Sequence, residues 1–286
     1  VLMKRVVITI LLMLASFSLR ATEPDSAEIT IRPVTSTFML KAGSSHRADT
    51  YLTPLKYEGW NAGFEYERFQ APRFAPERWI MALNMGFDVD RTMNVVRNAA
   101  MWGAGLEGRW ALWHRWNPIP AVTVGAGGST TLDVGALYQS RNGNNPVAAQ
   151  ASWTVDLSVM AAGRFKIGRI PAVVLYRASL PFIGAFFAPD YGQLYYEMYL
   201  GDTSGVVSVA RWGRYFRFDQ RLTIDFRLGS TTLRLGYSFD GGSTKVHSIV
   251  TRQVRHSAVI GVGGEWISLG HKRLTASDVR LIQSLY

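Results

Sequence analysis

The segment WTVDLSVMAAGRFK, residues Trp153 to Lys166, alternates between two kinds of side chain. Every second residue from Trp153 to Phe165 is apolar or glycine, and the positions between them include Asp156 and Arg164. On a helix, successive members of the apolar set would lie about 200° apart and would surround the axis. On a strand they share one face, so the segment predicts a β-strand with one apolar side.

The same alternation recurs along the chain. It is clear in WIMALNMGFDVD (79–90), QRLTIDFRL (220–228) and TLRLGYSF (232–239). Combinations of Asn, Asp, Gly, Pro and Ser, which form turns, separate the runs. We therefore expect strands at 35–44, 59–69, 77–90, 98–107, 109–116, 121–137, 149–166, 170–180, 193–201, 205–216, 219–228, 231–239, 244–253 and 256–268. Some neighbours in this series can be parts of one longer strand, so we prefer about 12 strands and keep 10 and 14 open.

Three features favour a transmembrane, antiparallel, up-and-down β-barrel over a soluble sandwich, whose strands also alternate. Many expected strands have about 9 to 14 residues, more than is usual in soluble sheets. Trp153 and Phe165 stand 12 residues apart, which is about 40 Å along a strand and about 30 Å along the membrane normal when the strand is tilted. Charges of both signs recur on the polar side of the strands, where a polar lumen would accommodate them. The sequence thus predicts one all-β domain.

The chain begins with the order of residues found in a secretory signal peptide. A short basic stretch precedes an apolar run, Val6–Leu14, and small residues follow. This run is too short to cross a bilayer as a helix, which takes about 20 residues. We predict a cleaved signal peptide at 1–21, with cleavage after Ala21 or, alternatively, Ser18, and an outer-membrane β-barrel domain at 22–286. A buried N-terminal helix is the less favoured interpretation.

Composition narrows the function further. The chain has no cysteine, which excludes disulfides, a thiolate nucleophile and thiolate metal ligands. The formal net charge is +10, yet no run of Lys and Arg supports nucleic-acid binding. An exported protein meets anionic lipid and glycan first. We expect the outer membrane of a Gram-negative bacterium as the location, with outer-membrane lipid, lipopolysaccharide and the barrel-assembly machinery as partners and no nucleic acid; the oligomeric state stays open.

Three blocks of sequence, DTYLTPLKYEGW (49–60), ALYQSRNGNNPVAAQ (136–150) and PFIGAFFAPDYGQLYYEMYLG (181–201), point to a family. They resemble the recurring blocks of a Bacteroidetes family catalogued as domain of unknown function 3316. The resemblance implies exported, outer-membrane proteins rich in β-structure, and it supplies no activity or catalytic residues. The chain departs from ordinary barrels at its end, DVRLIQSLY, where Tyr286 fits a terminal assembly signal but the alternation is imperfect, so the register of the last strand is open.

No catalytic constellation is visible. The five histidines, His46, His114, His247, His256 and His271, are scattered, and no Gly-x-Ser-x-Gly elbow occurs. His247, near Lys245 and Arg252, is the strongest candidate for catalysis among them. A cluster of His247 or His114 with a serine and a carboxylate would favour an enzyme. No spacing typical of zinc or calcium ligands is present either. We therefore predict a protein that is not an enzyme and needs no cofactor or metal.

The candidate functional residues are those on the inward side of the predicted strands. They are expected to line the lumen: Glu65, Glu67, Asp88, Glu107, Arg109, Asp156, Arg164, Tyr195, Glu197, Tyr199, Arg221, Asp225, Arg227, Arg234 and Glu265. These charges either pair and plug a narrow barrel or line a pore or small-solute site, and we favour the plug. Arg141, Asn144 and Asn145 are candidates for binding a ligand in a loop, although turn formation is the favoured explanation of these residues.

The sequence thus predicts an outer-membrane β-barrel that is a narrow or plugged channel or a structural barrel of the cell envelope. An outer-membrane lipid-modifying enzyme and a surface glycan-binding barrel remain the alternatives.

Overall fold

The computed structural model describes residues 29–143, 146–189, 200–201, 205–246, 248–267 and 279–285. The chain divides into two compact units, residues 1–30 with 271–280 and residues 31–270 with 281–286. The predicted signal peptide and Tyr286 lie outside the described residues, and so do Tyr195, Glu197, Tyr199 and most of the expected strand 193–201. Among the described residues, no helix is long and apolar enough to cross a membrane.

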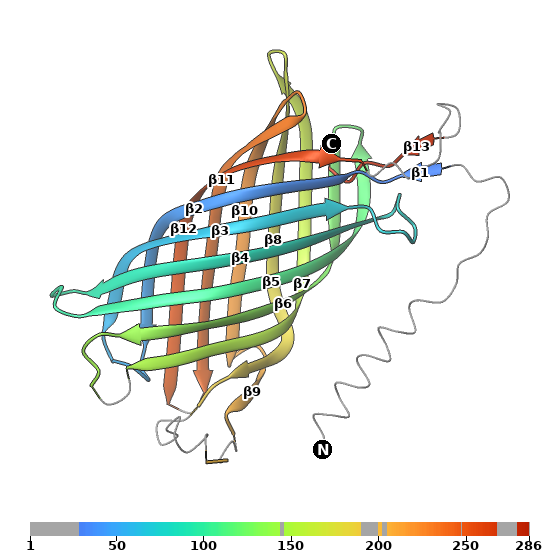
Figure 1. Ribbon diagram of the computed structural model, residues 1–286. Coiled ribbons are helices and arrows are strands. Elements are labelled where there is room, and N and C mark those ends of the chain that lie inside the picture. The colour runs from blue at the N-terminus through green and yellow to red at the C-terminus, as the bar shows by residue number, and fades with distance from the viewer. Residues whose placement is uncertain are drawn as a thin grey trace. The chain divides into compact units, whose positions relative to one another are not determined.

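The second unit is a closed antiparallel β-barrel of ten strands (Figure 1). Each strand pairs with the next along the chain, and β12 pairs with β2, while β8 pairs with β10. The barrel strands are β2 (Val34–Asp49), β3 (Lys56–Gln70), β4 (Trp79–Asn94), β5 (Ala100–Ile119), β6 (Val122–Gln139), β7 (Val147–Ile167), β8 (Ile170–Phe187), β10 (Tyr215–Leu228), β11 (Thr231–Val246) and β12 (Ile249–Trp266). The predicted all-β, up-and-down barrel is confirmed.

Three short strands stand outside this ring. β9 (Val207–Ala210) pairs with the end of β8. β1 (Ile29–Ile31) and β13 (Val279–Leu281) form a separate two-stranded sheet. Among the described residues, β12 is therefore the last barrel strand, and residues 279–285 add no further strand to the barrel.

The count of ten is one of the alternatives left open beside the preferred 12. The expected strands 98–107 and 109–116 are a single strand, β5, because Gly108 continues the ladder opposite Met85 and Leu132. The expected strand 205–216 yields only the four residues of β9 and the start of β10. The strands are also longer than expected, from 14 residues in β10 to 21 in β7.

The two ends of the barrel differ. At the turn end, two-residue turns join β5 to β6, β7 to β8 and β10 to β11, and Gly168 and Gly229 adopt the positive φ values, 60° and 69°, that such turns require. At the loop end, longer segments join β2 to β3, β4 to β5, β6 to β7 and β8 to β10. Two connections depart from this division, because residues 71–78 join β3 to β4 at the turn end and only residues 247–248 join β11 to β12 at the loop end. Mostly short turns at one end and mostly longer loops at the other are typical of outer-membrane barrels.

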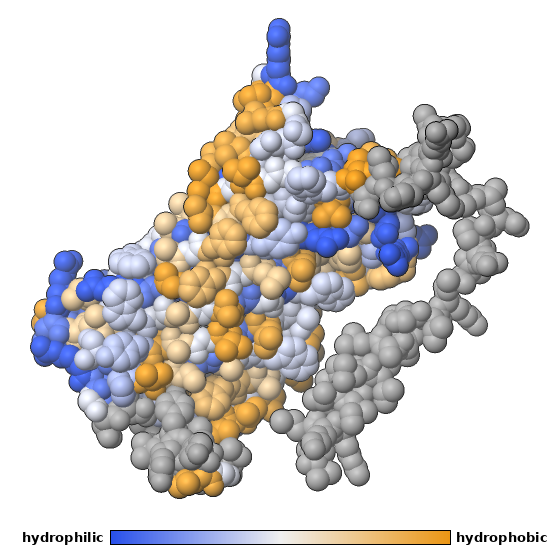
Figure 2. Space-filling view, in the orientation of Figure 1, coloured by the Kyte–Doolittle hydropathy of each residue, from blue (hydrophilic) through white to orange (hydrophobic). Residues whose placement is uncertain are grey.

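The exterior is apolar where the strands alternate. Leu157 is 53% exposed and lies outward between Trp153 and Phe165, both 41% exposed, while Asp156 and Ser158 are buried inside. Phe38, Leu106 and Ile260 continue the apolar surface around the barrel. Figure 2 shows hydrophobic side chains over the strands on one face of the barrel, with hydrophilic ones towards its ends. The residues that a soluble protein would bury therefore face outward, as lipid requires.

Candidate functional site

The middle of the lumen is filled by ion pairs, which we call the central network. Glu67, 1% exposed, contacts the guanidinium groups of Arg177 and Arg234 and lies 3.6 Å from Arg221. Arg221 also contacts Glu65, and Arg234 donates to both carboxylate oxygens of Asp225 at 2.7 Å. Because these residues come from β3, β8, β10 and β11, the contacts cross the lumen.

The network continues towards the loop end through Lys41 on β2. Lys41 lies 3.5 Å from Glu65 and 2.9 Å from Asp88. Asp88 is 3.8 Å from Arg255, which is in turn 3.8 Å from Asp240. The positive and negative side chains therefore alternate through the barrel, so each charge has partners of opposite sign.

Arg217 is the junction at the loop end of the network. It donates to Asp133 at 2.8 Å, to Glu107 at 2.5 Å and to Asp240 at 2.9 Å. Arg109 joins the same cluster, 2.7 Å from Asp219 and 3.2 Å from Glu107. A cavity of about 20 Å³ remains within the network, enough for about one water molecule. The lumen is filled at this level.

An apolar layer closes the turn end of the lumen. Inward side chains from five strands form a buried cluster, Phe69, Ile80, Ala82, Ala111, Trp113, Met160, Ala162, Val173 and Leu175, and Leu285 joins it. Leu285 is 1% exposed. Arg164 donates to its carbonyl oxygen at 3.0 Å, and Arg115 donates to that of Gln283 at 2.9 Å. The C-terminal residues thus fold into the barrel and seal this end.

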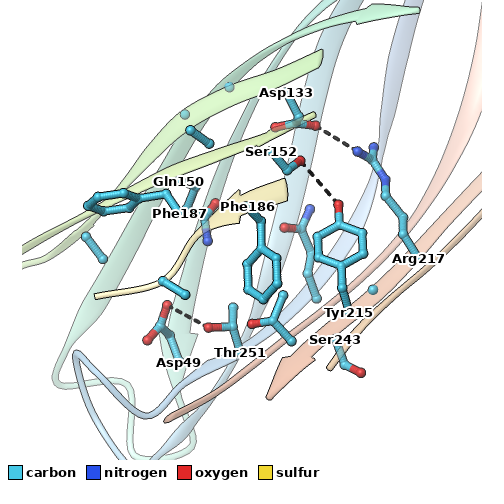
Figure 3. A pocket seen from close by; sticks show the side chains of 18 of the residues that line it. Asp49, Asp133, Gln150, Ser152, Phe186, Phe187, Tyr215, Arg217, Ser243 and Thr251 are labelled. Atoms are coloured by element: carbon cyan, nitrogen blue, oxygen red, sulfur yellow. Dashed lines mark hydrogen bonds and ion pairs between the residues drawn. The ribbon is translucent and has the colours of Figure 1, made fainter. Parts of the chain in front are cut away.

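The loop end holds a cavity of about 170 Å³, which we call the loop-end pocket. Figure 3 shows Phe186 and Tyr215 facing into it, with Asp133 and Arg217 joined at its inner side. Arg47, Gln253 and Arg255 also line it. Arg47 is held by a bidentate contact with the carboxylate of Asp90, at 2.6 and 2.5 Å. The central network is therefore the floor of the pocket.

The structure places the predicted lumen residues inside the barrel wherever it describes them. Glu65, Glu67, Asp88, Glu107, Arg109, Arg221, Asp225 and Arg234 belong to the central network. Asp156 stands apart and accepts hydrogen bonds from Ser129 and Thr131. Arg164 holds the C-terminal residues, and Arg227 pairs with Glu265 at 3.7 Å near the turn end.

The other candidates lie away from this network. In the loop between β6 and β7, the backbone N–H groups of Arg141 and Asn142 donate to the side chain of Gln139, while Asn144 and Asn145 lie outside the described residues. His114 lies outward at the turn end, its ring 5.1 Å from that of Trp79 and 4.6 Å from that of Trp116. His247 lies outside the described residues.

The sequence analysis missed about half of the charges that meet in the lumen. They are Lys41, Arg47, Asp90, Asp133, Arg177, Arg217, Asp219, Asp240 and Arg255. Asp219 lies within the expected strand 219–228 and shares the parity of Arg221, so the pattern was enough to find it. Starting that strand two residues earlier would have added Arg217. Arg177 has no such signal, because both parities around it, in AVVLYRASL, are largely apolar.

The apolar exterior, the polar interior and the asymmetric ends define a β-barrel of the outer-membrane class. A family described as protein of unknown function (DUF3316) matches residues 6–273, and the chain belongs to this family. The predicted membership of the family of unknown function 3316 is thereby confirmed, while its assignment to the Bacteroidetes stays a prediction. No curated protein matches the chain.

Several solved barrels have a similar fold. The outer membrane protease OmpT from Escherichia coli is 7% identical, covers 87% of this chain and 99% of its own, and has a TM-score of 0.47. The transport unit of the autotransporter AIDA-I from Escherichia coli is 9% identical, with coverage of 88% and 94% and a TM-score of 0.40. Neisserial surface protein A is 10% identical, with coverage of 81% and 97% and a TM-score of 0.31. At these values the likeness concerns the fold alone.

Proposed function

We propose that this protein is a sealed outer-membrane barrel, a structural or ligand-binding component of the cell envelope, and not a diffusion channel or an enzyme. The observation that carries the proposal is the central network, which spans the lumen and leaves a cavity of about 20 Å³. The apolar layer with Leu285 adds a second barrier at the turn end. The barrel sits in outer-membrane lipid, next to lipopolysaccharide, after insertion by the barrel-assembly machinery.

The energetics of the network support a closed state. Removing one partner of a buried ion pair costs about 3–5 kcal/mol, and a passage for hydrated ions would have to separate several such pairs. The ten strands also make a narrower barrel than the 16 to 18 strands of open porins. The charges are therefore better explained as filling than as the lining of a pore.

The catalytic alternative receives no support from the described residues. A lipid-modifying site would need a nucleophile, a base and a carboxylate within hydrogen-bond reach. Instead, His114 lies outward between two tryptophans, and His256 bonds to the hydroxyl of Tyr237 at 2.6 Å on the outer surface. The third described histidine, His46, lies 3.6 Å from Glu58, but both side chains are exposed to solvent.

Planar-bilayer recording tests the sealed lumen. The folded wild-type protein is expected to show no conductance steps in KCl, whereas a variant combining Arg217→Ser, Arg221→Ser, Glu65→Ser and Glu107→Ser, with residues 281–286 deleted, is expected to conduct. The four substitutions remove two positive and two negative charges and so leave the net charge of the network unchanged. Resistance to detergent when unheated, read as heat-modifiable gel migration, shows that each variant is folded. Regular steps from the wild-type protein would overturn the proposal.

A further inference from the structure

Three basic side chains lie together on the outer face of the barrel at the loop end, and we call them the basic patch. They are Arg214, which directly precedes β10, Lys245 near the end of β11 and Arg252 near the start of β12, and all three are exposed. The alternation places them on the outer side of their strands, together with Phe216 and Ile260. Among the described residues, none of the three takes part in an ion pair or a side-chain hydrogen bond. The basic patch thus differs from the central network, in which each charge has partners of opposite sign.

The backbone holds the three residues of the patch close together. The N–H group of Arg214 donates to the carbonyl oxygen of Arg211 at 3.0 Å and closes a turn before β10. The N–H group of Lys245 donates to the carbonyl oxygen of Arg214 at 2.7 Å, so these two residues lie directly opposite each other. Arg252 pairs with Ser243 and is therefore diagonal to Lys245. Side chains in these two relations start about 5 Å and about 7–8 Å apart, close enough for all three to reach one anion.

Among the described residues, no carboxylate shares this part of the outer face. The four acidic residues of β10, β11 and β12 all form ion pairs inside the barrel: Asp219, Asp225, Asp240 and Glu265. On β3, two strands further round the barrel from β12, the outward Glu58 lies 3.6 Å from His46. The outer side of these three strands therefore carries positive charge only.

Adjacent positive charges without a counter-ion cost free energy. Like charges directly opposite each other on neighbouring strands destabilise the pairing, and Arg214 and Lys245 stand in this relation. A bound anion replaces the repulsion by two attractions, and the planar guanidinium group of an arginine fits the oxygens of a phosphate. Since the described part of the chain supplies no negative charge here, the geometry favours an anion from outside the chain.

The patch lies at the level of the lipid head groups. Arg252 and Trp266 lie on the outer side of β12 and are 14 residues apart, which is about 46 Å along the strand and about 35 Å along the membrane normal at a tilt of about 40°. The hydrocarbon core is about 30 Å thick, and tryptophans gather at its boundaries. With Trp266 at one boundary, Arg252 is at the other. The longer loops of outer-membrane barrels face the cell exterior, so this boundary belongs to the outer leaflet.

We propose that the basic patch binds a phosphate group of lipid A, the membrane anchor of lipopolysaccharide. Three positive charges match a phosphate monoester, which carries a charge of about −1.5 to −2 at neutral pH, better than the single charge of a phospholipid phosphodiester. The apolar surface begins beside the patch, because Phe216, 49% exposed, pairs with Ser243, which pairs with Arg252. Acyl chains can lie against this surface, which a free phosphate ion would leave unused. The proposal rests on the proposed function, because it needs the barrel to sit in the outer membrane.

Native mass spectrometry of the folded barrel in detergent tests the binding. The probe is hexa-acylated lipid A, and EDTA is present so that no divalent metal ion bridges the phosphates. We expect the wild-type barrel to retain one lipid A, and to retain lipid A without its phosphates at least roughly tenfold less. The variant Arg214→Gln/Lys245→Gln/Arg252→Gln should retain intact lipid A at least roughly tenfold less than the wild type, since each basic side chain adds to the attraction.

A matched control removes three charges elsewhere. Arg78→Gln/Lys166→Gln/Arg169→Gln changes three exposed residues at the turn end and should retain lipid A like the wild type. Heat-modifiable gel migration shows that each variant is folded, and the comparison with dephosphorylated lipid A needs only the wild-type protein.

Three outcomes would contradict the proposal. Equal retention by the patch variant and the wild type would overturn the site. Equal retention of lipid A with and without its phosphates would overturn the ligand. An excess of phosphatidylglycerol should displace little lipid A from the wild type, and complete displacement would overturn the assignment to lipid A in favour of any anionic lipid.

Conductance separates this proposal from the sealed lumen. The side chains of the patch point away from the lumen, so the patch variant should stay silent in planar bilayers like the wild type. A wild-type barrel that conducts and retains lipid A would overturn the sealed lumen alone. A silent wild-type barrel that retains no lipid A would overturn the binding by the patch alone.

Discussion

Replacing the carboxylate of Glu67 tests directly whether water is excluded from the centre of the lumen. Glu67→Gln keeps the shape of the side chain and removes the negative charge that faces three guanidinium groups. Glu67 is 1% exposed and Arg234 is fully buried. Removing one partner of a buried ion pair costs about 3–5 kcal/mol, so we expect the free energy of unfolding to fall by that amount.

The measurement is urea unfolding of the barrel in lipid vesicles, followed by heat-modifiable gel migration. The midpoint shift multiplied by the wild-type slope gives the change in free energy. The control is Glu58→Gln on the same strand, whose side chain is 72% exposed and whose change should stay within about 0.5 kcal/mol. The double variant Glu67→Leu/Arg177→Met removes one charge of each sign and should recover most of the loss, because apolar pairs replace buried ion pairs at little cost.

Equal stability of Glu67→Gln and Glu58→Gln would refute the reasoning. It would mean that water screens the centre of the lumen, and the sealed barrel would then have to be abandoned.

Three further predictions concern other layers of the barrel, and the same unfolding measurement checks them. Leu285→Ala should lower the free energy of unfolding by about 2–5 kcal/mol because its side chain fills the apolar layer, while Leu281→Ala, 49% exposed, should have little effect. Leu157→Arg, at mid-strand on the outer face, should lower the free energy of unfolding by about 2–4 kcal/mol in a bilayer. Val147→Arg, at the loop end of the same strand, should lower it by only about 0–1 kcal/mol. Equal costs would contradict the assignment of the exterior to lipid. Trp113→Phe loses the hydrogen bond to Ser158 at 3.0 Å and leaves space unfilled in the buried apolar layer, so it should cost more than about 1 kcal/mol, an effect that Trp110→Phe, on the outer face, should not reproduce.

The alternation of side chains was enough to predict the barrel and the direction in which most strand residues point. The ends of β8 and β10 were harder to predict from the sequence. Residues 180–187 continue β8 through a proline and a bulge, and residues 215–218 extend β10 at its start. Aromatic residues on both faces hide the alternation in these segments. The sequence left open whether 98–107 and 109–116 are one strand. They are, since a glycine inside a strand does not by itself end pairing.

Much of the candidate site was beyond sequence reasoning. The partners of Glu67 come from β8, β10 and β11, and a periodic pattern gives the face of a residue but not its height relative to a strand on the opposite wall. The return of Leu285 into the lumen has no periodic signal at all, because it depends on packing against nine residues far away in sequence. The loop-end pocket likewise depends on where two strands separate.

The long reach of the central network bears on how the barrel folds. Arg221 and Glu65 are 156 residues apart, and Arg234 and Glu67 are 167 apart, so these pairs form only when the two edges of the growing sheet meet. A slip of one residue in β10 would turn Arg221 and Asp225 outward and bring Leu222 and Phe226 into the lumen. The ring therefore closes and the charges pair in the same late step of folding. A sheet in the wrong register could not form these ion pairs and would be less stable.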